Sequence, residues 1–196
     1  YMQKAVPLGT GGMAAIIGMD RERVIECCER ASFLGVVEAA NFNCPGQIVI
    51  SGHIPAVEKA CEYAKEIGAK RTVMLPVSAP FHSSLLKPAG DKLKSELEKI
   101  QIQSPVIPFV ANVTAQLVHS SDEIAELLIQ QVSHPILWED CVRNMVNMGM
   151  EIFIEMGPGK ALSGFVKKIH KESTILNVED LSTLEKTLSV IKGEEA

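Results

Sequence analysis

Hydrophobic and polar positions in the first part of the chain alternate between strand-like and helix-like periods. Short apolar runs end at glycines or turn residues, and between them apolar residues recur at helical spacing. Asp20 is suited to cap the first helix, and a proline suits the first turn of the second. The expected segments are a strand at 13–18, a helix after Asp20, strands at 36–43 and 47–52, a helix at 55–67 and a strand at 71–77. The order β-α-β-β-α-β is that of a ferredoxin-like unit.

The pattern changes after residue 84. Leu86, Ala89, Leu93 and Leu97 share one face of a helix expected over 84–100. A nearly all-apolar run then predicts a strand covered on both faces, and later strands alternate with helices, which implies a parallel α/β sheet. The expected elements are a strand at 106–113, a helix capped by Ser121, a helix at 138–148, a strand at 152–156, a helix at 160–171, a strand at 174–178 and a helix at 182–192.

These patterns predict an α/β protein with an inserted small domain. Turn residues at 7–12 and 76–80 are suited to be its two hinges. We therefore expect residues 1–11 to end one part of a large domain, 12–77 to form the ferredoxin-like small domain and 78–196 to continue the large domain. A cleft between such domains is a common place for a ligand.

Composition narrows the classes of function. Of the 196 residues 46% are hydrophobic and 22% charged, and the net charge of −5 comes without a basic tract, so we expect no nucleic-acid partner. No apolar run is long enough to span a bilayer, so no membrane partner is expected. The five cysteines lack the spacing of a zinc site or a disulfide framework. We expect free thiols, no metal and a cytoplasmic location.

The segment around His82 is the strongest candidate for chemistry. His82 lies between Pro80 and Pro88, which restrict the backbone, and imidazole suits acid–base work near neutral pH. A histidine with a purely structural hydrogen bond is the alternative. No GxSxG nucleophile motif occurs in these residues, and Ser83 and Ser84 are expected to cap the next helix.

A second candidate is the turn at 157–160, with the sequence Gly-Pro-Gly-Lys between a strand and a helix. Backbone amides at such a helix start can hold an anion. A tight structural turn is the alternative, because neither the dinucleotide-binding nor the P-loop pattern is complete.

Four separated motifs, in order, carry a resemblance to a known family. They lie at 41–52, 76–83, 110–113 and 155–160. Together they resemble malonyl-CoA:acyl carrier protein transacylase of bacterial type II fatty acid synthesis, over its C-terminal two thirds. The resemblance implies an α/β-hydrolase-like large domain, partial here, with a ferredoxin-like insert.

The resemblance also implies a reaction. In this family a serine in a GHSxG motif takes malonyl from malonyl-CoA and passes it to the phosphopantetheine thiol of acyl carrier protein, with a histidine as base. His82 matches that base, and Gln131 matches the residue whose backbone carbonyl orients it. The serine, the oxyanion loop and the arginine for the malonyl carboxylate would precede these residues, so the chain alone is expected to be inactive. No cofactor is expected beyond the substrate malonyl-CoA.

Further site residues follow from the same resemblance. Phe81 matches a position where phenylalanine accompanies malonyl selectivity by excluding an extra methyl group. Asn43 and Asn112 match polar positions near the acyl site. Lys70 and Arg71 are weaker candidates for contacts with CoA phosphates or the acidic carrier, and solvated surface charge is their alternative.

Two other functions remain open at this point. The chain could be a non-catalytic fragment that binds acyl carrier protein, although such a fragment has no need of His82 or Phe81. It could also be an α/β hydrolase, but that interpretation lacks the same serine and an acidic partner for the histidine.

Overall fold

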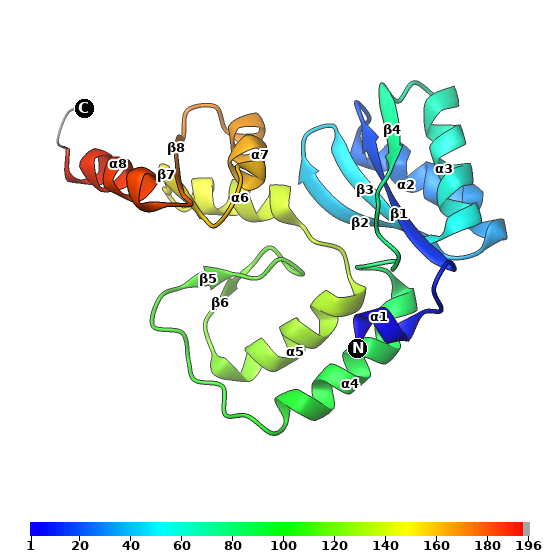
Figure 1. The fold of residues 1–196 in the computed structure, drawn as a ribbon, viewed down its shortest axis with the longest axis horizontal. Coiled ribbons are helices and arrows are strands. Elements are labelled where there is room, and N and C mark those ends of the chain that lie inside the picture. Colours follow the sequence, from blue (N-terminus) through cyan, green and yellow to red (C-terminus); the bar gives the residue numbers. More distant parts are fainter. Residues whose placement is uncertain (194–196) are drawn as a thin grey trace. The chain divides into compact units, whose positions relative to one another are not determined.

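The computed structural model describes residues 1–193, with the side chains of residues 3 and 4 left out. The chain forms two compact units, Tyr1–Cys141 and Val142–Ala196. Helices and strands are mixed in it, as an α/β protein requires (Figure 1). The division expected at residues 11/12 and 77/78 is a different one and stays a prediction.

The first unit contains a four-stranded antiparallel sheet. Its strand order is β2-β3-β1-β4. Along the chain the order is β-α-β-β-α-β, as expected from the sequence. The elements are β1 (Gly11–Ile17), α2 (Arg21–Ala31), η1 (Ser32–Leu34), β2 (Val37–Cys44), β3 (Gln47–His53), α3 (Ile54–Glu66) and β4 (Arg71–Met74).

Local signals set the ends of the two helices. Asp20 is the N-cap of α2, as predicted, and its Oδ1 accepts a hydrogen bond of 2.9 Å from the backbone N–H of Arg23. Pro55 lies in the first turn of α3, where its missing N–H leaves no hydrogen bond unmade. Just after α3 the chain turns at Gly68, whose φ of 104° suits glycine.

The two faces of this sheet are covered differently. Helices α2 and α3 pack on one face (Figure 1), where the core includes the fully buried Ile16, Val24, Ile50 and Val57. On the other face a smaller cluster contains Met13, Ala15, Ala40 and Val49, with Leu75 and Phe81 packed against it. The segment that carries His82 therefore begins on the face that α2 and α3 leave free.

The rest of the first unit is mostly helical. Its remaining elements are α1 (Met2–Ala5), η2 (Ser84–Leu86), α4 (Lys87–Leu97), β5 (Phe109–Val110), β6 (Leu117–Val118), α5 (Ser121–Ser133) and the start of α6 (Trp138–Asn147). Leu86 and Ala89 are buried and Leu93 packs beside them, as the helical spacing predicted. The predicted helix at 84–100 is shorter than expected and opens with a 3-10 turn.

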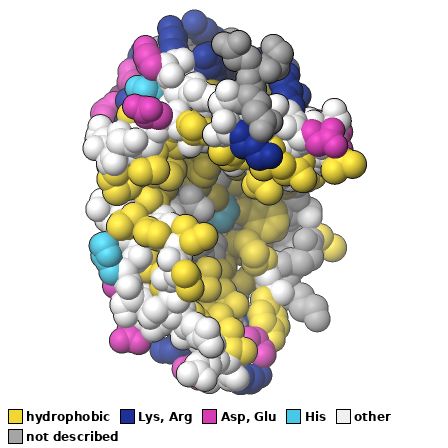
Figure 2. All heavy atoms as spheres, turned by 90° about the vertical axis from the view of Figure 1, so that its left-hand side faces the viewer, with side chains coloured by type: hydrophobic (Ala, Val, Ile, Leu, Met, Phe, Trp, Pro, Cys, Tyr) yellow, Lys and Arg dark blue, Asp and Glu magenta, His cyan; other side chains and the backbone are white. Residues whose placement is uncertain are grey.

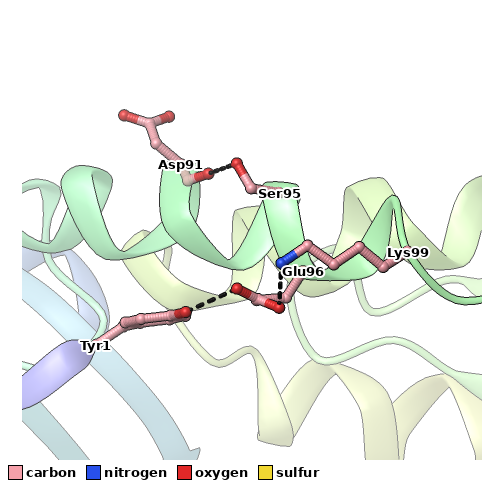
Figure 3. A network of polar contacts seen from close by, with 5 residues as sticks. All are labelled: Tyr1, Asp91, Ser95, Glu96 and Lys99. Atoms are coloured by element: carbon pink, nitrogen blue, oxygen red, sulfur yellow. Dashed lines mark hydrogen bonds and ion pairs between the residues drawn. The ribbon is translucent and has the colours of Figure 1, made fainter.

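Polar contacts join the start of the chain to α4 (Figure 3). The Tyr1 hydroxyl donates to Glu96 Oε1 at 2.8 Å, and Lys99 Nζ donates to Glu96 Oε2 at 2.8 Å. The hydrogen bond to Glu96 raises the pKa of Tyr1. Because these groups are exposed, they contribute little stability.

Two predictions for this region are wrong. The predicted strand at 106–113 is reduced to β5, and Val106 and Ile107 are 98% and 79% exposed instead of covered. Pro105 and Pro108 have no N–H to give to a neighbouring strand, which limits pairing. The cap of α5 is Ser120, whose Oγ accepts from the N–H of Asp122, and not Ser121.

The second unit is built around one parallel strand pair. It contains β7 (Ile152–Met156), α7 (Ala161–Ile169), β8 (Thr174–Val178) and α8 (Leu181–Lys192), with β7 parallel to β8. The sequence predicted a larger parallel sheet. Within the described residues only β7 and β8 form it, because β5 pairs with β6 in an antiparallel arrangement. Asp180 and Thr183 cap α8 reciprocally, and Gly193 ends it with a φ of 69°.

One face of β7 is apolar and open. Ile152, Ile154 and Met156 alternate along it and are 50%, 38% and 71% exposed. Hydrophobic side chains also reach the surface over much of the face drawn in Figure 2. Among residues 1–193, no helix combines the length and the apolar character needed to cross a bilayer.

The sheet makes one sharp stability prediction. A Cβ at Gly52 would lie 2.0 Å from the backbone oxygen of Val36, so Gly52→Ala forces two strands apart. We expect a loss of more than about 2 kcal/mol in the free energy of unfolding, measured by urea denaturation. Gly164→Ala is the control, because nothing lies within 4 Å of its added carbon. Equal stability of the two variants would contradict this close approach of the two backbones.

Candidate functional site

His82 has an unusual backbone conformation. Its φ is 58°, in the left-handed region that residues other than glycine rarely occupy. Such a conformation costs roughly 1 kcal/mol or more and persists only where surrounding contacts hold it. The side chain is half-buried. The residue that the sequence singled out is therefore one whose geometry other residues must maintain.

The C-terminal end of α5 faces the imidazole of His82. Nδ1 of His82 lies 2.9 Å from the backbone oxygen of Gln131, which is in the last turn of the helix. A carbonyl oxygen can only accept, so Nδ1 must carry the proton of this hydrogen bond. Nε2 is then left as an acceptor, which is the form a general base needs. The structure thus brings together the two residues expected to act as base and orienting group.

The surroundings of His82 act on its pKa in opposite directions. Burial lowers the pKa from 6.5, and hydrogen bonds to the backbone of Gln131 and His134 raise it, with burial the larger effect. The imidazole is therefore neutral at pH 7. The two backbone carbonyls, at the negative end of a helix dipole, would stabilise the charged form when it picks up a proton.

Three further contacts hold the loop around His82. Ser83 is fully buried, and its Oγ donates to the backbone oxygen of Pro80 at 2.7 Å. Ser84 donates from its N–H and its Oγ to the carboxylate of Glu38, at 2.7 and 2.8 Å. Pro80 packs so closely on Gly11 that a Cβ there would lie 2.4 Å from the proline ring. The predicted capping role of Ser83 and Ser84 is wrong, because both side chains hold the loop itself.

Sequence reasoning missed Glu38 and Gly11. A weak signal for Glu38 exists, because it is the one charged residue in β2. No pattern connects it to Ser84, which is 46 residues away in the chain.

Phe81 links two apolar clusters. It packs against the cluster of Met13 and Val49 on the sheet, and also against the cluster of Leu86 and Val132 on the helices. Its side chain therefore has a packing role of its own, next to the imidazole in sequence. This packing fixes the position of the ring for which the family resemblance implies a role in acyl selectivity.

The two asparagines lie in different surroundings. Asn43 is half-buried in β2. Asn112 accepts a backbone hydrogen bond of 2.8 Å from Leu137 and lines an apolar pocket of about 180 Å³, which Gln131 also lines. The hydrogen bonds described for residues 1–193 join neither asparagine to His82.

Lys70 and Arg71 lie at the other end of the sheet from His82. Arg71 pairs with Ile17 at the end of β1, whereas the His82 loop packs on Gly11 at its start. The length of β1 separates these two points, which corresponds to about 20 Å. Both basic residues are exposed, and Lys70 covers Gly18.

Two of the protein's own carboxylates bond the turn at 157–160 and the helix start after it, and Glu179 accepts from the Gly159 N–H at 3.1 Å. Glu155 accepts hydrogen bonds from the N–H groups of Leu162 and Ser163, at 3.1 and 2.8 Å. Burial opposes its charge, but a hydrogen bond from the Ser163 side chain, these two backbone bonds and one from Asn177 outweigh it and lower the pKa of Glu155. Because Glu155 already serves the start of α7, the geometry favours the structural turn over an anion site.

Within residues 1–193, no cluster of three or more His, Cys, Asp or Glu side chains is arranged to hold a metal ion. All five cysteines are buried, and none of them forms a disulfide.

Comparison with known proteins gives a consistent result. No protein-family model matches the chain. The malonyl CoA-acyl carrier protein transacylase of Bacillus subtilis is 44% identical over 195 residues, which are 99% of this chain and 62% of the relative. That of Escherichia coli K12 is 47% identical over 169 residues, 86% of this chain and 55% of the relative. The chain is homologous to part of the malonyl CoA-acyl carrier protein transacylases. It spans about three fifths of the length of these relatives.

Solved structures agree with this result. The malonyl CoA-acyl carrier protein transacylase from Clostridium perfringens superposes with a TM-score of 0.95 at 52% identity, covering 98% of this chain and 60% of that one. A malonyl-transacylase in complex with a type II PKS acyl-carrier protein superposes with a TM-score of 0.94 at 39% identity, covering 96% of this chain and 61% of that one. The resemblance is confirmed over nearly the whole chain.

The lowered pKa of His82 predicts a pH effect on stability. The unfolded chain takes up the proton near pH 6.5 while the folded chain resists it, so the free energy of unfolding should fall as the pH drops below 6.5. His82→Asn should flatten this dependence, because asparagine tolerates the left-handed backbone and does not titrate. Urea unfolding at several pH values measures it, with the exposed His119→Asn as control. A His82→Asn variant as pH-dependent as the parent would contradict a half-buried imidazole that the fold keeps neutral.

Proposed function

We propose that the protein containing this chain transfers a malonyl group from malonyl-CoA to the phosphopantetheine thiol of acyl carrier protein. The observation that carries the proposal is the hydrogen bond from His82 Nδ1 to the Gln131 backbone oxygen. It leaves Nε2 free as a base, in a chain 44% identical to a malonyl CoA-acyl carrier protein transacylase over 99% of its length. We also propose that such transfer occurs in the cytoplasm and needs no cofactor.

The proposed chemistry runs through a Ser-His pair. Nε2 of His82 accepts the serine proton while the serine oxygen attacks the thioester carbonyl of malonyl-CoA. The thiolate of CoA leaves and takes that proton from the imidazolium, so a malonyl ester remains on the serine. In the second half His82 accepts the proton of the carrier thiol, whose sulfur takes the malonyl group, and the serine recovers its proton.

The carbonyls at the end of α5 support both halves of this reaction. They lie where positive charge forms on the imidazole, so they need not reorganise during proton transfer. They also stand in for the carboxylate that orients the histidine in other triads. The nucleophile is not within these 196 residues, which contain no GxSxG motif. The proposed reaction therefore needs a serine from polypeptide outside them, and the chain alone should be inactive.

The remaining site residues have proposed roles around this pair. Phe81 would limit the size of the acyl group, supported by its fixed packing next to His82. Asn43 and Asn112 would give amide groups to the acyl site. Lys70 and Arg71 would contact the carrier or CoA phosphates, at a surface about 20 Å from the loop.

The architecture is proposed in the same way. The strand order β2-β3-β1-β4 supports a ferredoxin-like small domain at 12–77. The flanking segments 1–11 and 78–196 would belong to an α/β-hydrolase-like large domain, for which the parallel pair β7 and β8 is the available support.

A non-catalytic fragment that binds acyl carrier protein is the second candidate. Two observations favour it: these residues lack the serine motif, and one structural neighbour is solved in complex with an acyl-carrier protein. The left-handed, hydrogen-bonded His82 favours transfer instead, because docking to a carrier requires neither a strained backbone at a histidine nor an oriented imidazole.

A chimera tests the proposal. These 196 residues would replace the matching part of the Bacillus subtilis relative, and transfer of labelled malonyl from malonyl-CoA to holo-acyl carrier protein would be measured. We expect transfer, and a loss of roughly 100-fold to 10,000-fold in kcat for His82→Ala. His119→Ala, which changes an exposed histidine, is the control. A folded chimera that binds the carrier without transferring malonyl would favour the docking fragment.

Phe81 gives a separate prediction on selectivity. In the same chimera, Phe81→Ser should raise the ratio of methylmalonyl to malonyl transfer by about tenfold, because the pocket gains room for one methyl group. Since Phe81 also packs against two clusters, Phe81→Leu controls for the packing loss. Competing the two CoA esters in one reaction measures the ratio. An unchanged ratio for Phe81→Ser would remove Phe81 from the acyl site.

A further inference from the structure

We propose that Glu38 and Ser84 are positioning residues that hold His82 in its reactive geometry. This inference deepens the proposed function and rests on it, because the geometry matters only if His82 is the base. Neither residue is given a contact with the substrate in this proposal. They are proposed to act through the backbone of the loop, as a pair that we call the Glu38–Ser84 clamp.

The clamp uses both oxygens of one carboxylate. Oε2 of Glu38 accepts from the Ser84 N–H at 2.7 Å, and Oε1 accepts from Ser84 Oγ at 2.8 Å. Hydrogen bonds to a charged acceptor are shorter and about twice as strong as neutral ones. Two of them to one residue fix its orientation as well as its distance. Ser84 is half-buried, so water competes less for these bonds than at an open surface.

Ser84 is placed where it controls His82. It lies two residues after the left-handed φ of His82, and the intervening Ser83 is tied back to Pro80 by its own hydroxyl. The strained backbone is therefore held at both of its ends. If the clamp opens, residue 82 can relax to the ordinary negative φ, and this would turn the imidazole away from Gln131.

Strand β2 contacts both segments that take part in the hydrogen bond between His82 and Gln131. Glu38 on β2 holds the loop of His82, and two residues further along, the same strand meets the segment that follows α5. There the N–H of Ile136 donates to Ala40 O at 2.8 Å, and the N–H of Phe42 donates to Ile136 O at 2.9 Å. The loop that carries the base and the segment that follows its orienting helix are thus both hydrogen-bonded to the same strand. This shared strand is the observation that gives Glu38 a role beyond capping the helix after Ser84.

The test observes the His82 ring directly in this 196-residue chain. NMR of the ring nitrogens would give the fraction of the Nδ1–H tautomer and the pKa of His82, and hydrogen exchange would follow the Ser84 amide. For Glu38→Gln we expect exchange at Ser84 to accelerate about tenfold, since the Ser84 N–H then donates to a neutral amide oxygen instead of a charged carboxylate. The Nδ1–H fraction should fall, and the pKa of His82 should move up toward 6.5 as the ring becomes solvated.

Matched variants separate positioning from general stability. Ser84→Ala removes one of the two hydrogen bonds and should shift the tautomer in the same direction, and Ser84→Thr, which keeps the hydroxyl, should restore it. Glu29→Gln makes the same charge change at an exposed site on α2 and should leave the His82 ring unchanged. If circular dichroism shows that Glu38→Gln does not fold, the comparison of Ser84→Ala with Ser84→Thr tests the proposal instead.

One result overturns the proposal. In this result Glu38→Gln exchanges faster at Ser84, but its His82 has the same tautomer fraction and the same pKa as in Glu29→Gln. The clamp would then be a helix cap and nothing more. This readout needs no turnover. A chimera without malonyl transfer would count against the proposed function, whereas an unchanged ring would count against the clamp alone.

Discussion

The hydrogen bond between the His82 ring and the Gln131 backbone oxygen is the contact on which the site depends. It joins a loop that leaves the four-stranded sheet to the end of a helix 49 residues further along the chain. The loop alone would not adopt this shape, because its central residue has a left-handed backbone that only its neighbours maintain. The helix contributes a carbonyl that would otherwise need a partner, since the last carbonyls of any helix have none within it. The ring N–H gives the helix carbonyl a donor, and the carbonyl holds the ring in place, so the imidazole is oriented without a carboxylate.

The way this site is built explains why its parts come from the sheet as well as the helices. Phe81 fills the space between an apolar cluster on the sheet and one on the helices, while Pro80 lies against bare backbone at Gly11. Burial of the loop in this way lowers the pKa of His82 and keeps it neutral. The same burial places the neutral ring beside carbonyls that favour its charged form. A base that is neutral at rest and stabilised when protonated is a direct result of the packing.

Local sequence signals predicted the sheet and its two helices well and the rest less well. The order of six elements up to Met74 and the cap at Asp20 depend on periodicity and short-range chemistry, which are visible in the sequence. The run at 106–113 failed because β-propensity describes a strand only where another strand pairs with it, and Pro108 works against pairing. His82 stood out by its prolines, but Gln131 came only from family resemblance. The contact of Glu38 with Ser84 could not be predicted from the sequence, because it depends on the register of β2, which no local pattern encodes.

The contact between Gly11 and Pro80 has a consequence for how this sequence can vary. The ring occupies the volume where any other residue at position 11 would put its first side-chain carbon, at 2.4 Å from the proline Cδ. The two positions therefore constrain each other directly, although the chain passes through all four strands of the sheet from one to the other and each looks like an ordinary hinge residue. Among homologous sequences they should change together or not at all. A recombinant whose crossover falls between them would have to take both from one parent.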